Sequence, residues 1–235
     1  MKPLFSLILA FTFVCALSTT TASAATCESL ASATLPHTTI TSATIIAAGE
    51  FTHPGVPASA AVFKKLPAFC RVQGVIRPSS DSHIEFEVWL PSSGWNGKYL
   101  GIGNGGFAGS IRYVARPGSI TADMATALAG GYASSTTDTG HQAGVWESSW
   151  ALGHPERMID YGYRAIHETA LNAKAIIRAF YGTPPRKSYF NSCSNGGRQA
   201  LMEAQRFPED YDGISPALLR PPARPLPCFG TPRRR

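Results

Sequence analysis

The residues best suited to chemistry lie in one short segment around Ser194. From Tyr189 to Arg206 the chain reads YFNSCSNGGRQALMEAQR. An aromatic and apolar run precedes the serine, glycines follow it closely, and a helical pattern comes after them. A strand, a sharp turn and a helix would leave the hydroxyl at the tip of the turn, where it can attack a carbonyl carbon. These residues favour Ser194 as a catalytic nucleophile.

The segment from Ser192 to Gly196 fits the G-x-S-x-G nucleophile elbow of α/β-hydrolases, with serine in place of the first glycine. Small residues are needed there because the turn is strained and the strand and helix pass close together. We expect the following helix to bury one face, formed by Ala200, Leu201 and Ala204. An ordinary Gly-Gly turn is the alternative, but the surrounding strand and helix patterns favour the elbow.

A glycine-rich loop is the second candidate feature. A predicted strand at 98–103 runs directly into NGGFAGS, residues 104–110. Backbone N–H groups can approach a substrate oxygen where no Cβ intervenes, so Gly105 or Gly106 could form an oxyanion hole together with the N–H of Asn195. A flexible loop or a phosphate-binding turn is the alternative, although the Lys-Ser/Thr pair of a nucleotide site is missing.

Asp138 and His141 follow a predicted short strand at 131–135, which comes after a predicted helix at 121–129. Strand ends of an α/β sheet face the ligand crevice, so both side chains could line the site. A capping aspartate and a surface histidine in a turn explain them equally well.

A serine hydrolase also needs a histidine base and an acid, which follow the nucleophile along an α/β-hydrolase chain. All the histidines precede Ser194; they are at positions 37, 53, 83, 141, 154 and 167. Asp210 and Asp212 do follow it, but directly after the elbow helix, where a carboxylate more plausibly ends a helix or starts a strand. We therefore expect the catalytic Asp and His to be absent from this chain, with His141 acting out of chain order as the alternative.

The elements that must position these residues show clear periodicity. Alternating residues at 84–90 predict a strand with one buried face, and a second strand is expected at 71–77. Apolar residues at steps of three and four predict one helix over 159–180, ended by Gly182 and Pro184. His167 lies beside its apolar face, and we interpret it as a surface or packing residue. Residues 26–61 suggest an edge region of a sheet.

The two ends of the chain differ from its body. Residues 1–24 have the layout of a secretory signal, with an apolar stretch before Ala22-Ser23-Ala24, which predicts a secreted, extracellular protein. Residues 25–214 would form a partial α/β-hydrolase domain. Residues 215–235 are rich in proline and arginine, a composition typical of disorder. We expect a shifted reading frame, a missed splice site or a truncation to have produced this junction, with a selected basic tail as the alternative.

Charge disfavours nucleic acid as a partner. The formal net charge is +6, but six of the 21 basic residues are Lys2 and five arginines beyond position 219, which leaves 15 basic against 15 acidic residues. No basic stripe with interleaved aromatic residues is present. No stretch outside the signal approaches the ~20 apolar residues of a membrane-spanning helix, so no membrane association is expected.

Four cysteines remain without the signal: Cys27, Cys70, Cys193 and Cys228. In an oxidising compartment we expect Cys27 to pair with Cys70, because both lie in the N-terminal region and the bridge would pin the leader. No C-x-x-C or H-E-x-x-H pattern supports a metal site.

Three longer segments resemble the tannase and feruloyl esterase family of secreted serine esterases between Cys70 and Ile214. They are YFNSCSNGGRQALMEAQRFPEDYDGI at 189–214, GNGGFAGS at 103–110 and STTDTGH at 135–141. The resemblance implies an α/β-hydrolase core with a large lid inserted after the nucleophile region, often with a calcium site, and hydrolysis of phenolic-acid esters. It also implies Ser194 as nucleophile and a disulfide from Cys193 to a cysteine just after the catalytic histidine.

The chain is thus expected to be an α/β-hydrolase core truncated after the elbow helix. The lid, its calcium, the C-terminal strands and the family partner of Cys193 would all be missing, and Cys228 is a poor substitute for that partner. The predicted function is hydrolysis of feruloyl or galloyl esters, with a small phenolic ester or a plant cell-wall or tannin substrate as the partner. A non-catalytic secreted fragment or ligand-binding remnant is the main alternative, and a lipase or peptidase on the same fold is another.

Overall fold

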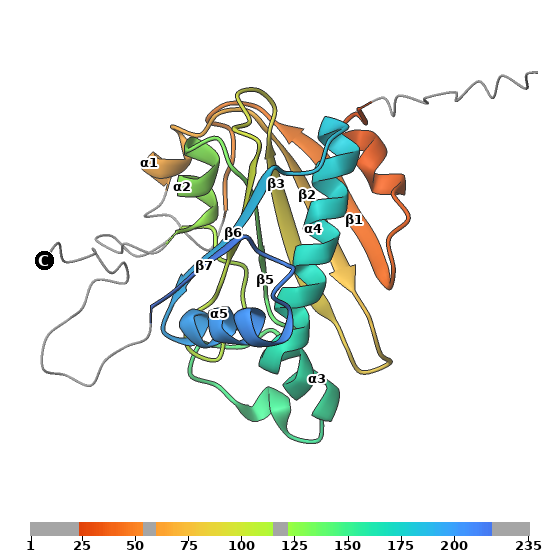
Figure 1. Cartoon of the computed structure of the whole chain (residues 1–235), viewed down its shortest axis with the longest axis vertical. Coiled ribbons are helices and arrows are strands. Elements are labelled where there is room, and N and C mark those ends of the chain that lie inside the picture. The colour runs from red at the N-terminus through yellow and green to blue at the C-terminus, as the bar shows by residue number, and fades with distance from the viewer. Residues whose placement is uncertain (1–23, 54–59, 115–121, 218–235) are drawn as a thin grey trace, which may run out of the picture.

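The computed structural model describes residues 24–53, 60–114 and 122–217, so the predicted signal and most of the predicted tail lie outside the described residues. Within them the chain forms a seven-stranded sheet in the order β1-β2-β3-β5-β4-β6-β7 (Figure 1). In chain order the strands are Thr38–Ile46, Phe69–Ile76, Ile84–Pro91, Lys98–Ile102, Ala133–Thr137, Lys187–Cys193 and Gly213–Ala217.

The sheet has an antiparallel half and a parallel half. β1, β2, β3 and β5 pair antiparallel, whereas β4 pairs parallel with both β5 and β6, and β6 pairs parallel with β7. Because β4 and β6 are parallel neighbours, with Ile102 opposite Asn191, the loops that follow them emerge at the same edge of the sheet. One of these loops begins with Ser194 and the other contains the glycines.

Helical segments cover the sheet and connect its strands (Figure 1). They are the 3₁₀ turns Glu28–Ser32 and Ser149–Ala151, the α-helices α1 Ala60–Phe63, α2 Met124–Ala129, α3 Pro155–Ile159, α4 Ala165–Tyr181 and α5 Asn195–Arg206, and a π-helical turn Asp160–Arg164. Asp123 caps α2 by accepting the N–H of Thr126 at 2.7 Å. Gly182 ends α4 in the left-handed conformation, as its position after the periodic run predicts.

The core lies on both faces of the sheet. Phe86, Val88 and Leu90 of β3 join the apolar cluster with α4, while Trp89 joins the cluster with α2. The strand predicted at 84–90 is present as β3. The expectation that only one of its faces is buried is wrong, since even Glu87 is only 2% exposed. Its carboxylate is satisfied by Arg71, Trp89 and the Tyr113 hydroxyl, partners that local sequence does not reveal.

The helix predicted over 159–180 is interrupted. Its apolar face is buried as expected at Ile166, Ala170, Ala173 and Ile177, but the turn Asp160–Arg164 is π-helical and joins α3 to α4. At the other end of the domain, β7 continues to Ala217, beyond the predicted boundary at 214. Pro216 is accommodated because β7 is an edge strand.

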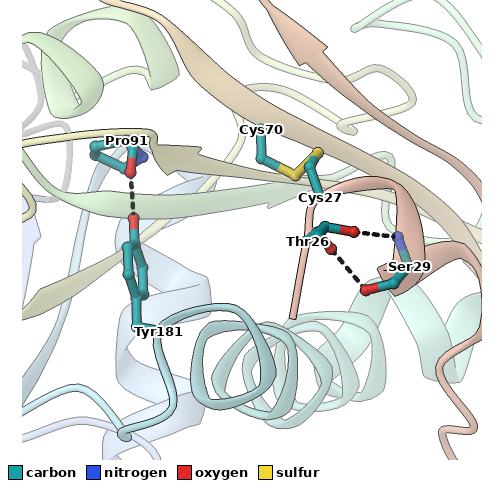
Figure 2. Close-up of a disulfide and its surroundings, with 6 residues drawn as sticks. All are labelled: Thr26, Cys27, Ser29, Cys70, Pro91 and Tyr181. Carbon is teal, nitrogen blue, oxygen red and sulfur yellow. Dashed lines mark hydrogen bonds between the residues drawn. A yellow bond between two sulfur atoms is a disulfide. The ribbon is translucent and has the colours of Figure 1, made fainter. Parts of the chain in front are cut away.

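The disulfide between Cys27 and Cys70 is confirmed, with 5.6 Å between the Cα atoms (Figure 2). It fastens the N-terminal 3₁₀ turn to β2. On the same side of the molecule, the Tyr181 hydroxyl at the end of α4 donates to the Pro91 carbonyl at 2.8 Å. Cys193 is also disulfide-bonded. The expectation that its family partner, a cysteine just after the catalytic histidine, is missing stays a prediction. None of the described helices is long and apolar enough to cross a membrane.

Candidate active site

Ser194 lies at a sharp junction between β6 and α5. Its backbone has φ 61° and ψ −122°, and α5 begins with the next residue, Asn195. A non-glycine residue with positive φ is strained, and such strain concentrates at functional sites. The strand, turn and helix predicted around Ser194 are therefore present, and the partly exposed serine occupies the tip of the turn.

Two glycines allow the backbones around this turn to approach. A Cβ at Gly196 would overlap the Ser192 side chain and lie 2.9 Å from the Asn104 carbonyl oxygen. A Cβ at Gly103 would lie 2.7 Å from the Ser192 Cβ and 2.6 Å from the Gln199 Oε1. The elbow thus depends on a small residue at 192 and on glycine at 196 and 103.

The buried face of α5 differs from the prediction. Leu201 is 45% exposed and Ala204 is exposed, whereas Gln199, Ala200 and Glu203 are buried. The prediction from the apolar residues failed because two of the buried residues, Gln199 and Glu203, are polar.

Gln199 fastens α5 to the glycine loop. Its Oε1 accepts the Asn104 N–H at 3.0 Å, and its Nε2 donates to the Asn104 Oδ1 at 3.3 Å. Asn104 in turn donates through Nδ2 to the Thr137 carbonyl at 2.8 Å. The loops after β4, β5 and β6 are thereby joined through two amide side chains.

Three backbone N–H groups near the elbow have no protein acceptor among the described residues. They are those of Gly105, Gly106 and Asn195. The Asn195 N–H is unpaired because it belongs to the first turn of α5. Gly106 has φ 57°, and a Cβ there would overlap the Val145 carbonyl, whereas a Cβ at Gly105 would meet nothing within 4 Å. The loop therefore presents free donors beside the start of α5.

His141 and Asp138 follow β5 and contact the glycine loop. His141 is 5% exposed, stacks on Trp150 at 3.7 Å between ring centroids, and places Nε2 2.8 Å from the Phe107 carbonyl oxygen. Burial lowers the pKa of His141. Asp138 accepts the N–H groups of Glu85 and Gly140 at 3.0 and 2.8 Å, and burial raises its pKa well above the ordinary value.

No hydrogen bond joins Ser194 to a histidine among the described residues. His141 contacts the glycine loop through Phe107 instead, and His167 lies 2.6 Å from Asp210 through Nδ1 and stacks on Phe207. Asp212 accepts the Ser188 N–H at 2.8 Å and binds Lys187 at 2.7 Å. Asp210 thus contacts α4, and Asp212 contacts the start of β6.

Sequence reasoning missed two side chains that contact Asn195, the residue after the serine: Tyr161 and Arg198. The Tyr161 hydroxyl donates to the Asn195 Oδ1 at 2.9 Å, and the Arg198 Nε donates to the same oxygen at 2.8 Å. The sequence could have indicated Arg198, because residues at i and i+3 on a helix, such as Asn195 and Arg198, are neighbours. Nothing local indicates Tyr161, which is 34 residues away in the chain.

An apolar cavity of about 480 Å³ lies beside the edge strand β7 and α2, lined in part by Leu100, Tyr132, Tyr189 and Ile214, and does not include Ser194. Among the described residues no group of three or more His, Cys, Asp or Glu side chains could hold a metal ion.

A nucleophile-elbow serine and a glycine loop at the carboxyl edge of a mixed sheet define an α/β-hydrolase core. Residues 70–220 match the family described as Tannase and feruloyl esterase, and the chain belongs to this family.

Individual relatives agree with this placement. The chain is 49% identical over 199 residues to an uncharacterized esterase of Xanthomonas campestris pv. campestris, covering 85% of this chain and 32% of the relative. It is 39% identical over 152 residues to "Probable feruloyl esterase B-2" of Aspergillus flavus, covering 63% of this chain and 27% of the relative. The crystal structure of feruloyl esterase B from Aspergillus oryzae superimposes with a TM-score of 0.65 at 31% identity, over 80% of this chain and 35% of that one. The chain thus spans about a third of the length of these relatives.

Proposed function

We propose that this chain carries the catalytic nucleophile of a secreted carboxylic ester hydrolase that acts on phenolic-acid esters such as feruloyl or galloyl esters. The observation that carries the proposal is the positive-φ Ser194 beside three backbone N–H groups that have no acceptor among the described residues. The names of the relatives support the substrate class. The Cys27–Cys70 disulfide supports an oxidising, extracellular location for the protein.

In the proposed reaction the Ser194 Oγ attacks the ester carbonyl carbon, and a histidine base takes the hydroxyl proton. The tetrahedral oxyanion accepts hydrogen bonds from the N–H of Asn195 and from Gly105 or Gly106. Collapse expels the alcohol, which takes up the proton from the histidine, and leaves an acyl-enzyme on Ser194 that water then hydrolyses. The base and its acid are not assigned to any described residue.

The test compares Ser194→Ala with Ser192→Ala, which removes a neighbouring serine hydroxyl. The purified 235-residue chain and the longest open reading frame containing it are assayed with methyl ferulate, methyl gallate and a long-chain acyl ester. We expect phenolic esters to be hydrolysed by the form that contains a base, and Ser194→Ala alone to abolish this activity. Preference for the long-chain ester would instead favour a lipase.

A non-catalytic secreted fragment is the second candidate, because the described residues give Ser194 no histidine partner. Reaction with a fluorophosphonate probe separates the two, since a serine without a base labels weakly or not at all. Covalent labelling of Ser194 in the 235-residue chain would contradict the non-catalytic proposal, whereas binding of ferulate without labelling would support it.

A further inference from the structure

The Tyr161 hydroxyl lies between the two parts of the proposed oxyanion hole. It donates to the Asn195 Oδ1 at 2.9 Å and lies 3.4 Å from the Gly106 carbonyl oxygen. Asn195 would supply one oxyanion donor and the Gly105–Gly106 segment the other. One side chain from a third element therefore contacts both.

Arg198, one turn further along α5, holds the same asparagine. Its Nε donates to the Asn195 Oδ1 at 2.8 Å, while its two terminal nitrogens donate to the carbonyls of Gly162 and Tyr161 at 2.7 and 2.9 Å. The guanidinium carbon also lies 4.5 Å from the centroid of the Tyr161 ring. Because the Asn195 Nδ2 is buried and has no partner among the described residues, Tyr161 and Arg198 fix the orientation of this amide.

The π-helical turn Asp160–Arg164 places Tyr161 there. π-helical turns insert an extra residue into a helix and are frequent at functional sites. The buried Asp160 anchors this one by accepting the Arg164 Nε at 2.6 Å and by packing on Gly140, where a Cβ would lie 2.7 Å from the Asp160 Cβ. The Tyr161 ring also packs near Trp150, with centroids 5.3 Å apart, so its position does not depend on its hydroxyl alone.

We propose that Tyr161 and Arg198 are positioning residues for the oxyanion hole. They hold the Asn195 side chain, and through it the Asn195 N–H, in register with the glycine loop. The inference rests on the proposed ester hydrolysis. Oxyanion donors act mainly in the transition state, so loosening one lowers kcat and leaves KM nearly unchanged.

The test uses Tyr161→Phe, which removes the hydroxyl and keeps the ring against Arg198 and Trp150, in the form of the protein that shows Ser194-dependent hydrolysis of methyl ferulate. We expect kcat for methyl ferulate to fall about tenfold, the scale of one hydrogen bond, with KM within about twofold. Tyr163→Phe is the matched control, since Tyr163 lies in the same π-helical turn but packs on Phe207 and Arg206. It should leave kcat unchanged.

A double-mutant cycle with Asn195→Ala identifies the route of the effect. Asn195→Ala keeps the backbone N–H and removes the side chain that Tyr161 holds. If Tyr161 acts through Asn195, adding Tyr161→Phe to Asn195→Ala lowers kcat no further. Three outcomes would each overturn the inference. The losses in kcat of the two single variants add up in the double variant, kcat of Tyr161→Phe is unchanged, or the loss in kcat is matched by a fall in melting temperature.

Failure of the two proposals is distinguishable. Wild-type kcat in Tyr161→Phe, within a protein whose turnover requires Ser194, overturns only the positioning role. A wild-type protein without Ser194-dependent turnover overturns both, because Asn195 would then have no oxyanion to bind.

Discussion

Gly196 lies so close to Ser192 that a Cβ at position 196 would overlap the serine side chain. The contact joins the first turn of α5 to the last residues of β6 and encloses the strained Ser194. Serine can therefore replace the first glycine of the elbow pattern, at position 192, because glycine at position 196 leaves room for the serine side chain.

Gly196→Ala is therefore expected to lower the free energy of unfolding by about 1 to 3 kcal/mol, the usual cost of overpacking. Urea denaturation measures it. The control is Gly144→Ala, because a Cβ there meets nothing within 4 Å. Equal stability of the two variants would contradict the close approach.

The glycine loop can be tested at Gly105, where an added Cβ meets nothing within 4 Å. Gly105→Pro removes the N–H donor and should reduce kcat about 100- to 1,000-fold if this N–H binds the oxyanion. Gly105→Ala keeps the donor and should lose far less. Equal turnover of the proline and alanine variants in steady-state assays would remove the Gly105 N–H from the mechanism.

Glu203 is expected to make stability depend on pH. Burial, and then the neighbouring Asp210 carboxylate, raise the pKa of Glu203 from 4.5 to about 9. The folded state thus keeps a proton that the unfolded chain releases above its ordinary pKa. The stabilising contribution is complete below about pH 4.5 and is lost as pH rises toward 9, by up to about 1.4 kcal/mol per pH unit.

Glu203→Gln removes this titration and keeps the side-chain shape. Its melting temperature should exceed that of the wild type by a margin that grows from pH 6 to pH 9. The exposed Glu209→Gln serves as control and should follow the wild type. A constant difference between Glu203→Gln and wild type across this range would show that Glu203 does not titrate there.

The Cys27–Cys70 bridge spans 43 residues of sequence, and its loss should cost about 2 to 4 kcal/mol of unfolding free energy. Cys27→Ser, Cys70→Ser and the double variant should lose the same amount, since the bridge needs both sulfur atoms. Urea midpoints without reductant measure this. Additive losses in the double variant would mean that the cysteines act through packing instead.

The sequence by itself determined the elements with strong local signals. The elbow follows from a serine among small residues between a strand pattern and a helix pattern. The Cys27–Cys70 pair follows from an oxidising compartment, and the buried face of α4 from helical periodicity. The elbow and the helical face depend on residues near one another in the chain, and the disulfide depends on the few cysteines and the compartment.

Only the tertiary structure decided which polar groups could be buried. Glu87, Gln199 and Glu203 are buried at positions that an apolar pattern assigns to solvent. Glu87 is bound by Arg71 and Gln199 by Asn104, both from distant segments of the chain. The same holds for Tyr161, which lies in a π-helical turn and donates to Asn195 from 34 residues away in the chain. A hydrogen bond between residues far apart in sequence leaves no periodic trace, since its geometry exists only after the sheet has brought the strand ends together.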